Sequence, residues 1–220
     1  MSILTNDSSI PDFIFFWDKK STKFKIEKKD NFYKNGIKFF YRNFYPKPKG
    51  IKNKNFLIII IGNPILENKI NYPSDFNFLN DEENMKKING QFIFILIDKK
   101  KKELKVFNDR FSSIPVYYAN QSNSFILSFS YLSLVKIISK KKEFKFSGDA
   151  MYEFIRFQRI FGSKTLDNMS NFLVSASVLK ISPKKIIINK YWFADFKNKC
   201  NLSSNKKAER LSKLLRQSMK

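Results

Sequence analysis

The chain has 220 residues, 43% of them hydrophobic, and 42 Lys and Arg against 19 Asp and Glu give it a net charge of +23. A chain of this length and apolar content can bury a core and fold as a globular protein. It contains no histidine, and Cys200 is its only cysteine. These counts exclude a disulfide framework, a cysteine metal cluster, histidine ligation of metals and catalytic triads built on histidine.

The strong positive charge is typical of proteins that bind nucleic acid or an anionic surface. Two observations argue against that interpretation. The lysines are scattered through expected turns and strand edges, at 99–102, 140–142 and 184–185, and Lys is over-used together with Asn, Ile and Phe, which all have A/T-rich codons. We therefore expect solvated lysines and no nucleic-acid partner. A stand-alone basic module that binds nucleic acid or an anionic glycan is the alternative hypothesis.

The sequence also bears on location. No apolar run reaches membrane-spanning length, and residues 1–12 are polar, without the basic-then-apolar order of a signal peptide. This predicts a cytoplasmic protein with no membrane contact, whose residues 1–12 form a flexible N-terminal extension.

Several strands are expected in the first third of the chain, because short apolar or alternating runs are separated by turn residues. They are 12–17, 23–27, 37–42 after the hairpin dipeptide Asn35-Gly36, and 56–61, which we expect Gly62-Asn63-Pro64 to end. Residues 45–50 are predicted to be a loop, since two prolines there forbid pairing in a central strand. A helix over 75–87 follows, with Ser74 as its expected N-cap.

The most informative stretch is a predicted hairpin. Within Ile88 to Asp98, both alternating sets of residues are apolar from Phe92 to Ile97, so the strand is expected to be buried on both faces. Lys99 to Lys102 form the solvated tip, and Glu103 to Phe107 form the partner strand. Asp109 opens the turn that follows.

The second half of the chain is predicted to mix strands and helices. We expect a strand at 125–129 and a helix with Leu134 and Ile138 on its apolar face. A second helix from Ser147 is expected to have Met151, Phe154, Ile155 and Ile160 as its apolar face. A last helix from about Ser203 carries an apolar stripe of Leu211, Leu214, Leu215 and Met219.

The order of these motifs resembles class II glutamine amidotransferases, most nearly the N-terminal half of asparagine synthetase. Asn89-Gly90-Gln91-Phe92 through Asp98 resembles the family's core strand, and Asp109-Arg110-Phe111, Pro115 and Tyr117-Tyr118 resemble the segment after it. The resemblance implies an α+β fold, a four-layer αββα sandwich of two antiparallel sheets flanked by helices. It implies a domain over 13–196, followed at 197–220 by a linker and the first helix of a synthetase half.

The family's catalytic groups are missing from the matching positions. The resemblance implies an N-terminal cysteine that opens the first strand, but this sequence begins Met1-Ser2. An N-terminal Ser2 is the alternative nucleophile, and Cys200 is interpreted as a free surface thiol. In register, Gly62 replaces the oxyanion Asn, Pro64 replaces a Glu, and the neutral Asn89 replaces the carboxylate that pairs with the substrate's ammonium.

The sequence therefore predicts a degenerate glutaminase-like domain with no catalytic residue and no metal site. Gly62, Asn63, Asn89 and Gly90 are the expected remnant of substrate binding, while Asp109, Arg110, Pro115 and Tyr118 are expected to serve structure. No cofactor is expected in this chain, since ATP and magnesium would belong to the synthetase half. The expected partner is that synthetase domain or subunit; homo-oligomer formation and the acceptor substrate stay open.

Overall fold

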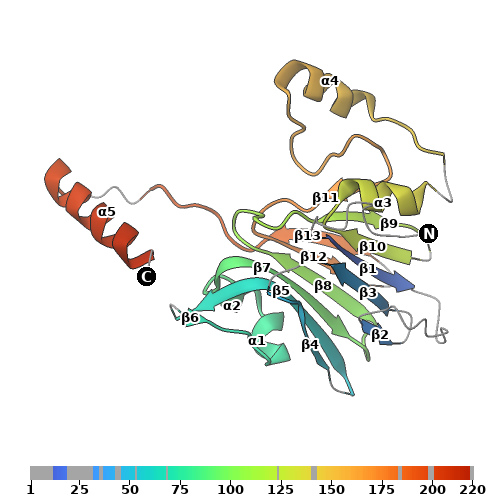
Figure 1. The fold of residues 1–220 in the computed structure, drawn as a ribbon, viewed down its shortest axis with the longest axis horizontal. Helices are drawn as coiled ribbons and strands as arrows, with labels where there is room; N and C mark the ends of the chain where they lie inside the picture. The colour runs from blue at the N-terminus through green and yellow to red at the C-terminus, as the bar shows by residue number, and fades with distance from the viewer. Residues whose placement is uncertain are drawn as a thin grey trace.

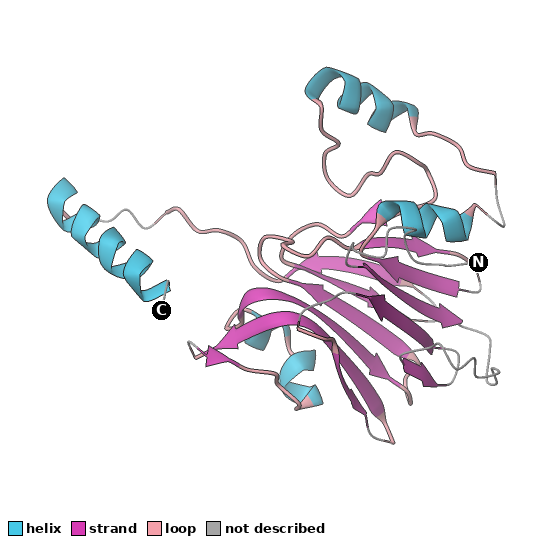
Figure 2. Cartoon of the chain, in the orientation of Figure 1, coloured by secondary structure: helices cyan, strands magenta, loops and turns pink. Residues whose placement is uncertain are grey.

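The chain forms two antiparallel sheets with helices around them, an α+β arrangement (Figures 1 and 2). The structure is a computed structural model, and it describes residues 12–18, 32–34, 37–42, 46–52, 54–67, 69–122, 124–139, 143–182, 185–197 and 201–218. The strand expected at 23–27, the turn at Asn35-Gly36, Ser2 and Cys200 lie outside these residues.

One sheet is six-stranded, in the order β11-β9-β10-β1-β3-β2. Its strands are β1 (Asp12–Asp18), β2 (Phe32–Lys34), β3 (Ile37–Arg42), β9 (Tyr117–Asn120), β10 (Ser124–Ser128) and β11 (Asn171–Phe172). The other sheet is seven-stranded, in the order β13-β12-β8-β7-β5-β4 with β6 paired to β5. Its strands are β4 (Lys49–Lys52), β5 (Phe56–Leu66), β6 (Lys69–Ile70), β7 (Asn89–Asp98), β8 (Glu103–Asn108), β12 (Ser177–Ile181) and β13 (Ile186–Lys190).

The predicted hairpin is confirmed and forms the centre of the seven-stranded sheet. Its strands β7 and β8 pair antiparallel, with Phe94 opposite Phe107 and Ile95 opposite Val106. Ile93, Ile95 and Ile97 belong to the apolar cluster between the two sheets. Phe92, Phe94 and Leu96 face the other way, into the cluster shared with the helices. The two apolar sets of this strand therefore exist because the strand is covered on both faces.

The helices are α1 (Phe76–Asn80), α2 (Glu82–Met85), α3 (Tyr131–Ile138), α4 (Gly148–Phe157) and α5 (Ser204–Ser218). The first two contribute Leu79 and Met85 to the cluster on the seven-stranded sheet. Helix α3 contributes Leu134 and Ile138 to a cluster on the outer face of the six-stranded sheet. Within the described ranges, no helix is both long enough and apolar enough to cross a membrane.

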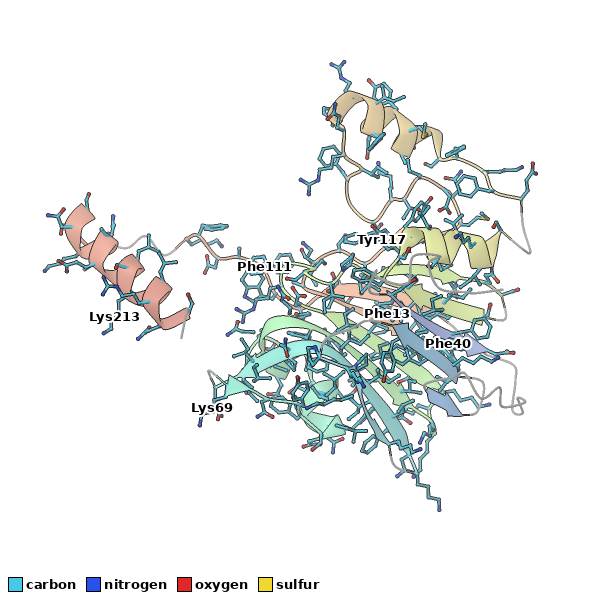
Figure 3. All side chains as sticks on the ribbon, viewed as in Figure 1. Phe13, Phe40, Lys69, Phe111, Tyr117 and Lys213 are labelled. Carbon is cyan, nitrogen blue, oxygen red and sulfur yellow. The ribbon has the colours of Figure 1, made fainter. Side chains whose placement is uncertain are left out.

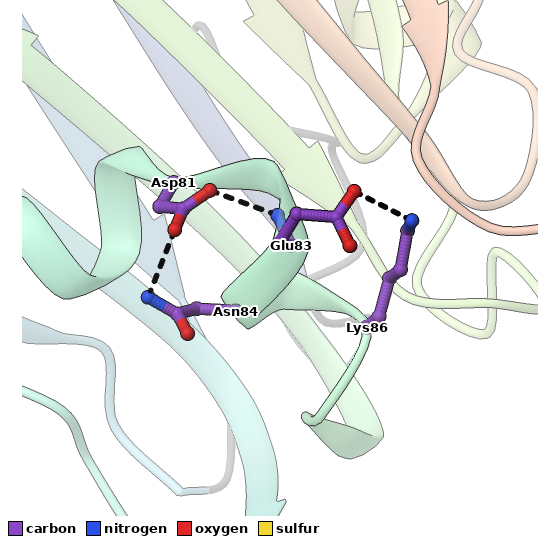
Figure 4. Close-up of polar contacts among 4 residues, drawn as sticks. All are labelled: Asp81, Glu83, Asn84 and Lys86. Carbon is purple, nitrogen blue, oxygen red and sulfur yellow. Dashed lines mark hydrogen bonds and ion pairs between the residues drawn. The ribbon is translucent and has the colours of Figure 1, made fainter.

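The prediction of a single helix over 75–87 is wrong, and so is the prediction of Ser74 as its N-cap. Asp75, not Ser74, is the N-cap of α1, where its carboxylate accepts a hydrogen bond from the Asn77 amide at 2.9 Å. Asp81 adopts an extended backbone that ends α1 and caps α2, accepting from the Glu83 amide at 3.0 Å (Figure 4). A second capping residue thus starts a new helix in a new direction.

Two strand boundaries also differ from expectation. Strand β5 does not end at Ile61, because β7 pairs with it as far as Ile65, opposite Asn89. The predicted loop at 45–50 is wrong at its end, since β4 begins at Lys49 and pairs with β5. Both prolines of that segment precede the strand, so the pairing loses no hydrogen-bond donor to them.

Helix α4 begins as predicted, since the Ser147 side chain accepts from the Ala150 amide at 3.3 Å. The apolar face of this helix, however, is not buried. Phe154 is 48% exposed and Ile155 is 75% exposed, Met151 is half-buried, and Ile160 lies beyond the end of the helix. Figure 1 shows α4 standing off from the sheets, with α5 lying apart from them on another side. The apolar periodicity marks a helix correctly, yet this structure provides no surface to cover it.

Candidate functional site at the ends of β5 and β7

The four predicted remnant residues lie together on two paired strands. Gly62 is opposite Phe92, Asn63 is opposite Gln91, and Pro64 is opposite Gly90 in the β5–β7 register. Asn89 follows at the start of β7, opposite Ile65. The fold therefore joins two short motifs that are separate in the sequence.

Gly62 and Gly90 have a reciprocal geometry that other residues do not fit. Both have a left-handed backbone, with φ of +89° at Gly62 and +88° at Gly90. A Cβ at Gly62 would lie 2.2 Å from the Gln91 carbonyl oxygen and 2.8 Å from Ile114 Cδ1. A Cβ at Gly90 would lie 2.2 Å from the Asn63 carbonyl oxygen. Each glycine is thus required by the backbone of the opposite strand.

Asn63 is half-buried, and its side-chain oxygen accepts a hydrogen bond from the Tyr72 hydroxyl at 3.2 Å. The Lys49 ammonium lies over the Tyr72 ring, 3.2 Å from its centroid. The segment that carries Tyr72 is held by the Asn71 amide, which donates to the Pro64 carbonyl at 3.0 Å. Tyr72 and Lys49 were not predicted, because neither stands in a motif. Only the tertiary fold brings Tyr72 to Asn63 and Lys49 to Tyr72.

Asn89, Gly90 and Gln91 are exposed, so the start of β7 faces solvent. Together with Asn63 and Tyr72, these positions offer amide groups and a phenol rather than ionised acids. Such groups can hold a ligand through neutral hydrogen bonds, which are weaker than charge-assisted ones. Among the described residues, no cluster of acidic or cysteine side chains has the arrangement of a metal site.

Asp109 is fully buried and acts on the turn after β8. Its carboxylate accepts from the amides of Phe111, at 2.9 Å, and of Ser113, at 3.1 and 3.2 Å, and from the Ser113 hydroxyl at 3.1 Å. Its own amide donates to the Phe92 carbonyl at 3.1 Å. The donors of the turn therefore satisfy this buried carboxylate, and the carboxylate in return fixes the turn.

Arg110 joins three parts of the chain. Its guanidinium donates to the Lys86 carbonyl at the end of α2, at 2.5 Å, and lies 5.0 Å from the Trp192 ring centroid. Trp192 in turn meets the exposed Phe111 ring edge-on, with centroids 6.3 Å apart. This contact holds the chain as it leaves β13 (Figure 3 labels Phe111).

Pro115 and Tyr118 lie where the chain enters β9. Pro115 is half-buried just before the strand, and Tyr118 is 5% exposed within the cluster between the sheets. Burial raises the pKa of Tyr118, so its phenol stays protonated near neutral pH. Both residues pack the fold and present no reactive group.

Asn108 was not singled out from the sequence, yet it fixes this region. Its buried amide nitrogen donates to the Ser112 hydroxyl at 2.8 Å and to the carbonyls of Leu173 and Val174 at 3.1 and 2.9 Å. Its side-chain oxygen accepts from the Ser177 amide at 2.9 Å. The Tyr191 hydroxyl donates to its carbonyl at 2.7 Å, and burial together with the Asp109 charge raises the pKa of Tyr191.

Comparisons with known proteins give one family match and similar solved structures. A family described as glutamine amidotransferase domain matches residues 79–192. The glutamine phosphoribosylpyrophosphate amidotransferase from B. subtilis, complexed with ADP and GMP, is similar over 84% of this chain and 43% of its own, at 9% identity and a TM-score of 0.46. The structure of the allosteric regulatory enzyme of purine biosynthesis gives the same coverage and identity and a TM-score of 0.47.

The chain thus spans less than half the length of these two solved structures. No curated protein sequence matches it. The family match runs from α1 through the core hairpin to Trp192 and covers more than half of the chain, so this chain belongs to the glutamine amidotransferase domain family.

Proposed function

We propose that this chain is the glutaminase-like domain of an asparagine-synthetase-type protein, that it does not hydrolyse glutamine, and that it is a scaffold for an ATP-dependent, amide-forming half. We further propose that its fold is the four-layer αββα sandwich of the N-terminal-nucleophile hydrolases. The family match and the apolar clusters on both outer sheet faces support this proposal.

The observation that carries the proposed inactivity is the close approach of β5 and β7. The resembling enzymes use an Asn side chain at position 62 to hold the oxyanion, and here a single Cβ would already lie 2.2 Å from the Gln91 carbonyl oxygen. That carbonyl would also face a developing negative charge with its own partial negative charge. An oxyanion site needs donors directed at the charge, and loss of one typically costs about 10²–10³ in rate.

Two further features support the loss of activity. Strand β1 opens with Asp12, a fully buried carboxylate that accepts from the Ser133 hydroxyl at 2.7 Å. In the resembling enzymes a cysteine nucleophile opens this strand. The exposed amide of Asn89 also cannot form the charge-assisted pair with an ammonium group that a carboxylate would form.

An ammonia-release assay with glutamine tests the proposed inactivity. We expect release by the purified chain to equal that of a no-enzyme control and to be unchanged in Ser2→Ala. Release above the control that disappears in Ser2→Ala would instead assign an N-terminal serine nucleophile and overturn the proposal. Release that Ser2→Ala leaves unchanged would overturn it as well.

The proposed scaffold role concerns the C-terminal residues 197–220. Every described side chain of α5 is exposed, including Leu211, Leu214 and Leu215 at 59%, 53% and 54%. We propose that a synthetase domain or subunit covers this stripe, and that ATP and magnesium bind there and not to this chain. A coding sequence for an ATP-pyrophosphatase loop, either in frame with this chain or in an adjacent gene, supports the scaffold role. The absence of such a sequence from both places contradicts the scaffold role.

A second candidate function is binding of an anionic polymer, and α5 also motivates it. Lys206, Lys207, Arg210, Lys213 and Arg216 are all exposed on this helix. Fluorescence anisotropy with labelled single-stranded RNA and with heparin measures such binding. Affinity that falls steeply with salt and drops when these residues are neutralised supports it, whereas weak binding that these changes do not alter excludes it.

A further inference from the structure

A pocket on the outer face of the six-stranded sheet has no part in the function proposed above. It has a volume of about 410 Å³ and lies between β9, β11, α3 and the segment that follows α4. Tyr117, labelled in Figure 3, lies where that segment returns toward the sheet. The volume falls within the range typical of small-molecule sites, about 300–1,000 Å³.

Aromatic rings form one side of this pocket. Tyr117 and Phe172 are opposite each other in the β9–β11 register, with ring centroids 5.5 Å apart. The Tyr131 ring from α3 lies 5.6 Å from Tyr117. Its hydroxyl donates to Asp167 Oδ2 at 2.8 Å, which holds the ring in place. The pocket therefore offers fixed aromatic surfaces on which a flat ring can stack.

The opposite side is the segment after α4, and hydrogen bonds hold its shape. Gln158 ends α4 in the left-handed conformation, with φ of +53°. Glu153 accepts from the Phe161 amide at 3.0 Å and pairs with the Lys164 ammonium. The Ser163 carbonyl accepts from the Phe172 amide at 2.8 Å, which ties this segment to β11. The pocket is thus formed before any ligand binds, which lowers the cost of binding.

Of the described charged side chains that line the pocket, Lys164 has a carboxylate partner and Arg159 has none. Glu153 neutralises Lys164. Asp167 is buried and accepts hydrogen bonds from Tyr131, from the Met169 amide at 2.6 Å and from the Ser170 amide at 2.7 Å. The Arg159 guanidinium lies 5.8 Å from the Phe161 ring centroid, and it forms no ion pair among the described residues. An exposed guanidinium beside aromatic rings suits a planar anion.

We propose that this pocket binds a small, flat aromatic anion. The ring lies against Tyr117 and Phe172, whose planes are inclined by 57°, so it stacks on one ring and meets the other with its edge. The carboxylate or phosphate of the ligand accepts hydrogen bonds from Arg159. Both parts of the ligand are required. The aromatic surfaces alone do not fix the orientation of the ligand, and a single exposed arginine binds a lone anion weakly.

Titration of the whole chain with 2-naphthoate, followed by calorimetry and by amide NMR shifts, tests the proposal. Two further probes test the aromatic ring and the negative charge of the ligand separately. 2-naphthalenemethanol keeps the ring without the charge, and acetate keeps the charge without the ring. We expect saturable binding of 2-naphthoate at millimolar concentrations or below, with shifts at Phe161 and Tyr117. The alcohol and acetate should each bind at least about tenfold more weakly.

The variants Arg159→Ala and Arg156→Ala form a matched pair, since both arginines are exposed and only Arg159 lines the pocket. Arg159→Ala should weaken 2-naphthoate binding by about tenfold or more, while Arg156→Ala should leave it within about twofold. The proposal is overturned if 2-naphthoate does not bind at millimolar concentration, if the alcohol binds equally well, or if the two variants have equal effects.

Discussion

The core hairpin and the two outlying helices carry equally clear apolar patterns, but only the hairpin is covered. Phe92 to Ile97 in β7 are at most 3% exposed, because the second sheet lies on one face and α1 and α2 lie on the other. The apolar stripes of α4 and α5 point largely to solvent. An apolar period therefore identifies an element and its inner face, whereas burial depends on whether another surface is present to meet that face.

The largest expected effect lies in the hairpin. Phe94→Ala should lower the free energy of unfolding by about 3–5 kcal/mol, because it leaves a cavity in a filled core. Phe157→Ala in α4 removes the same ring from a site that is 56% exposed, so its effect should stay within about 0.5 kcal/mol. Urea denaturation measures both. Equal losses would show that α4 is as well covered as the hairpin.

Substitution of glycine by alanine should have opposite effects on stability at Gly62 in β5 and at Gly148 in α4. Gly62→Ala should cost at least about 1–3 kcal/mol, since it combines a left-handed backbone with a clash against Gln91. Gly148→Ala, in the first turn of α4, meets nothing within 4 Å and should stabilise by about 0.4–1 kcal/mol. Thermal unfolding of both variants measures these changes in stability. A Gly62→Ala variant with unchanged stability would mean that β5 and β7 do not approach so closely.

A slightly smaller loss is expected at Asn108. Asn108→Ala leaves the Ser177 amide and the carbonyls of Leu173 and Val174 without their partner, at a cost of about 1–3 kcal/mol. The exposed Asn168 is the matched control, and its change to Ala should be near neutral. Similar denaturation midpoints for the two variants would show that the hydrogen bonds of the Asn108 side chain do not stabilise the fold.

The smallest effect concerns the segment after α4. Hydrogen bonding to Lys164 and to the Phe161 amide lowers the pKa of Glu153 below its ordinary 4.5. The contact is therefore complete above pH 4.5 and is lost as the pH falls through the lower folded-state pKa. The Phe161 amide resonance should shift over that acid range and should not do so in Glu153→Gln. A shift centred above pH 4.5 would contradict the lowered pKa.

The hairpin could be predicted because its pattern is local and both its faces are apolar. The break at Asp81 could not, since an aspartate at this position can lie within one longer helix or cap a second one. Gly62, Asn63, Asn89 and Gly90 could be singled out by resemblance, and the β5–β7 register then explains why they meet. Tyr72 reaches Asn63, and Lys49 reaches Tyr72, only through tertiary structure, so no sequence pattern marks them.

Native-state hydrogen exchange on the isolated, monomeric chain most directly tests the central proposal, that a partner covers the exposed C-terminal helix α5. Amides of Phe92 through Ile97 should exchange only with global unfolding, whereas those of Leu211 through Leu215 should exchange orders of magnitude faster, through local opening. Strong protection at Leu211 through Leu215 in a proven monomer would show that α5 docks on its own domain and would contradict the claim.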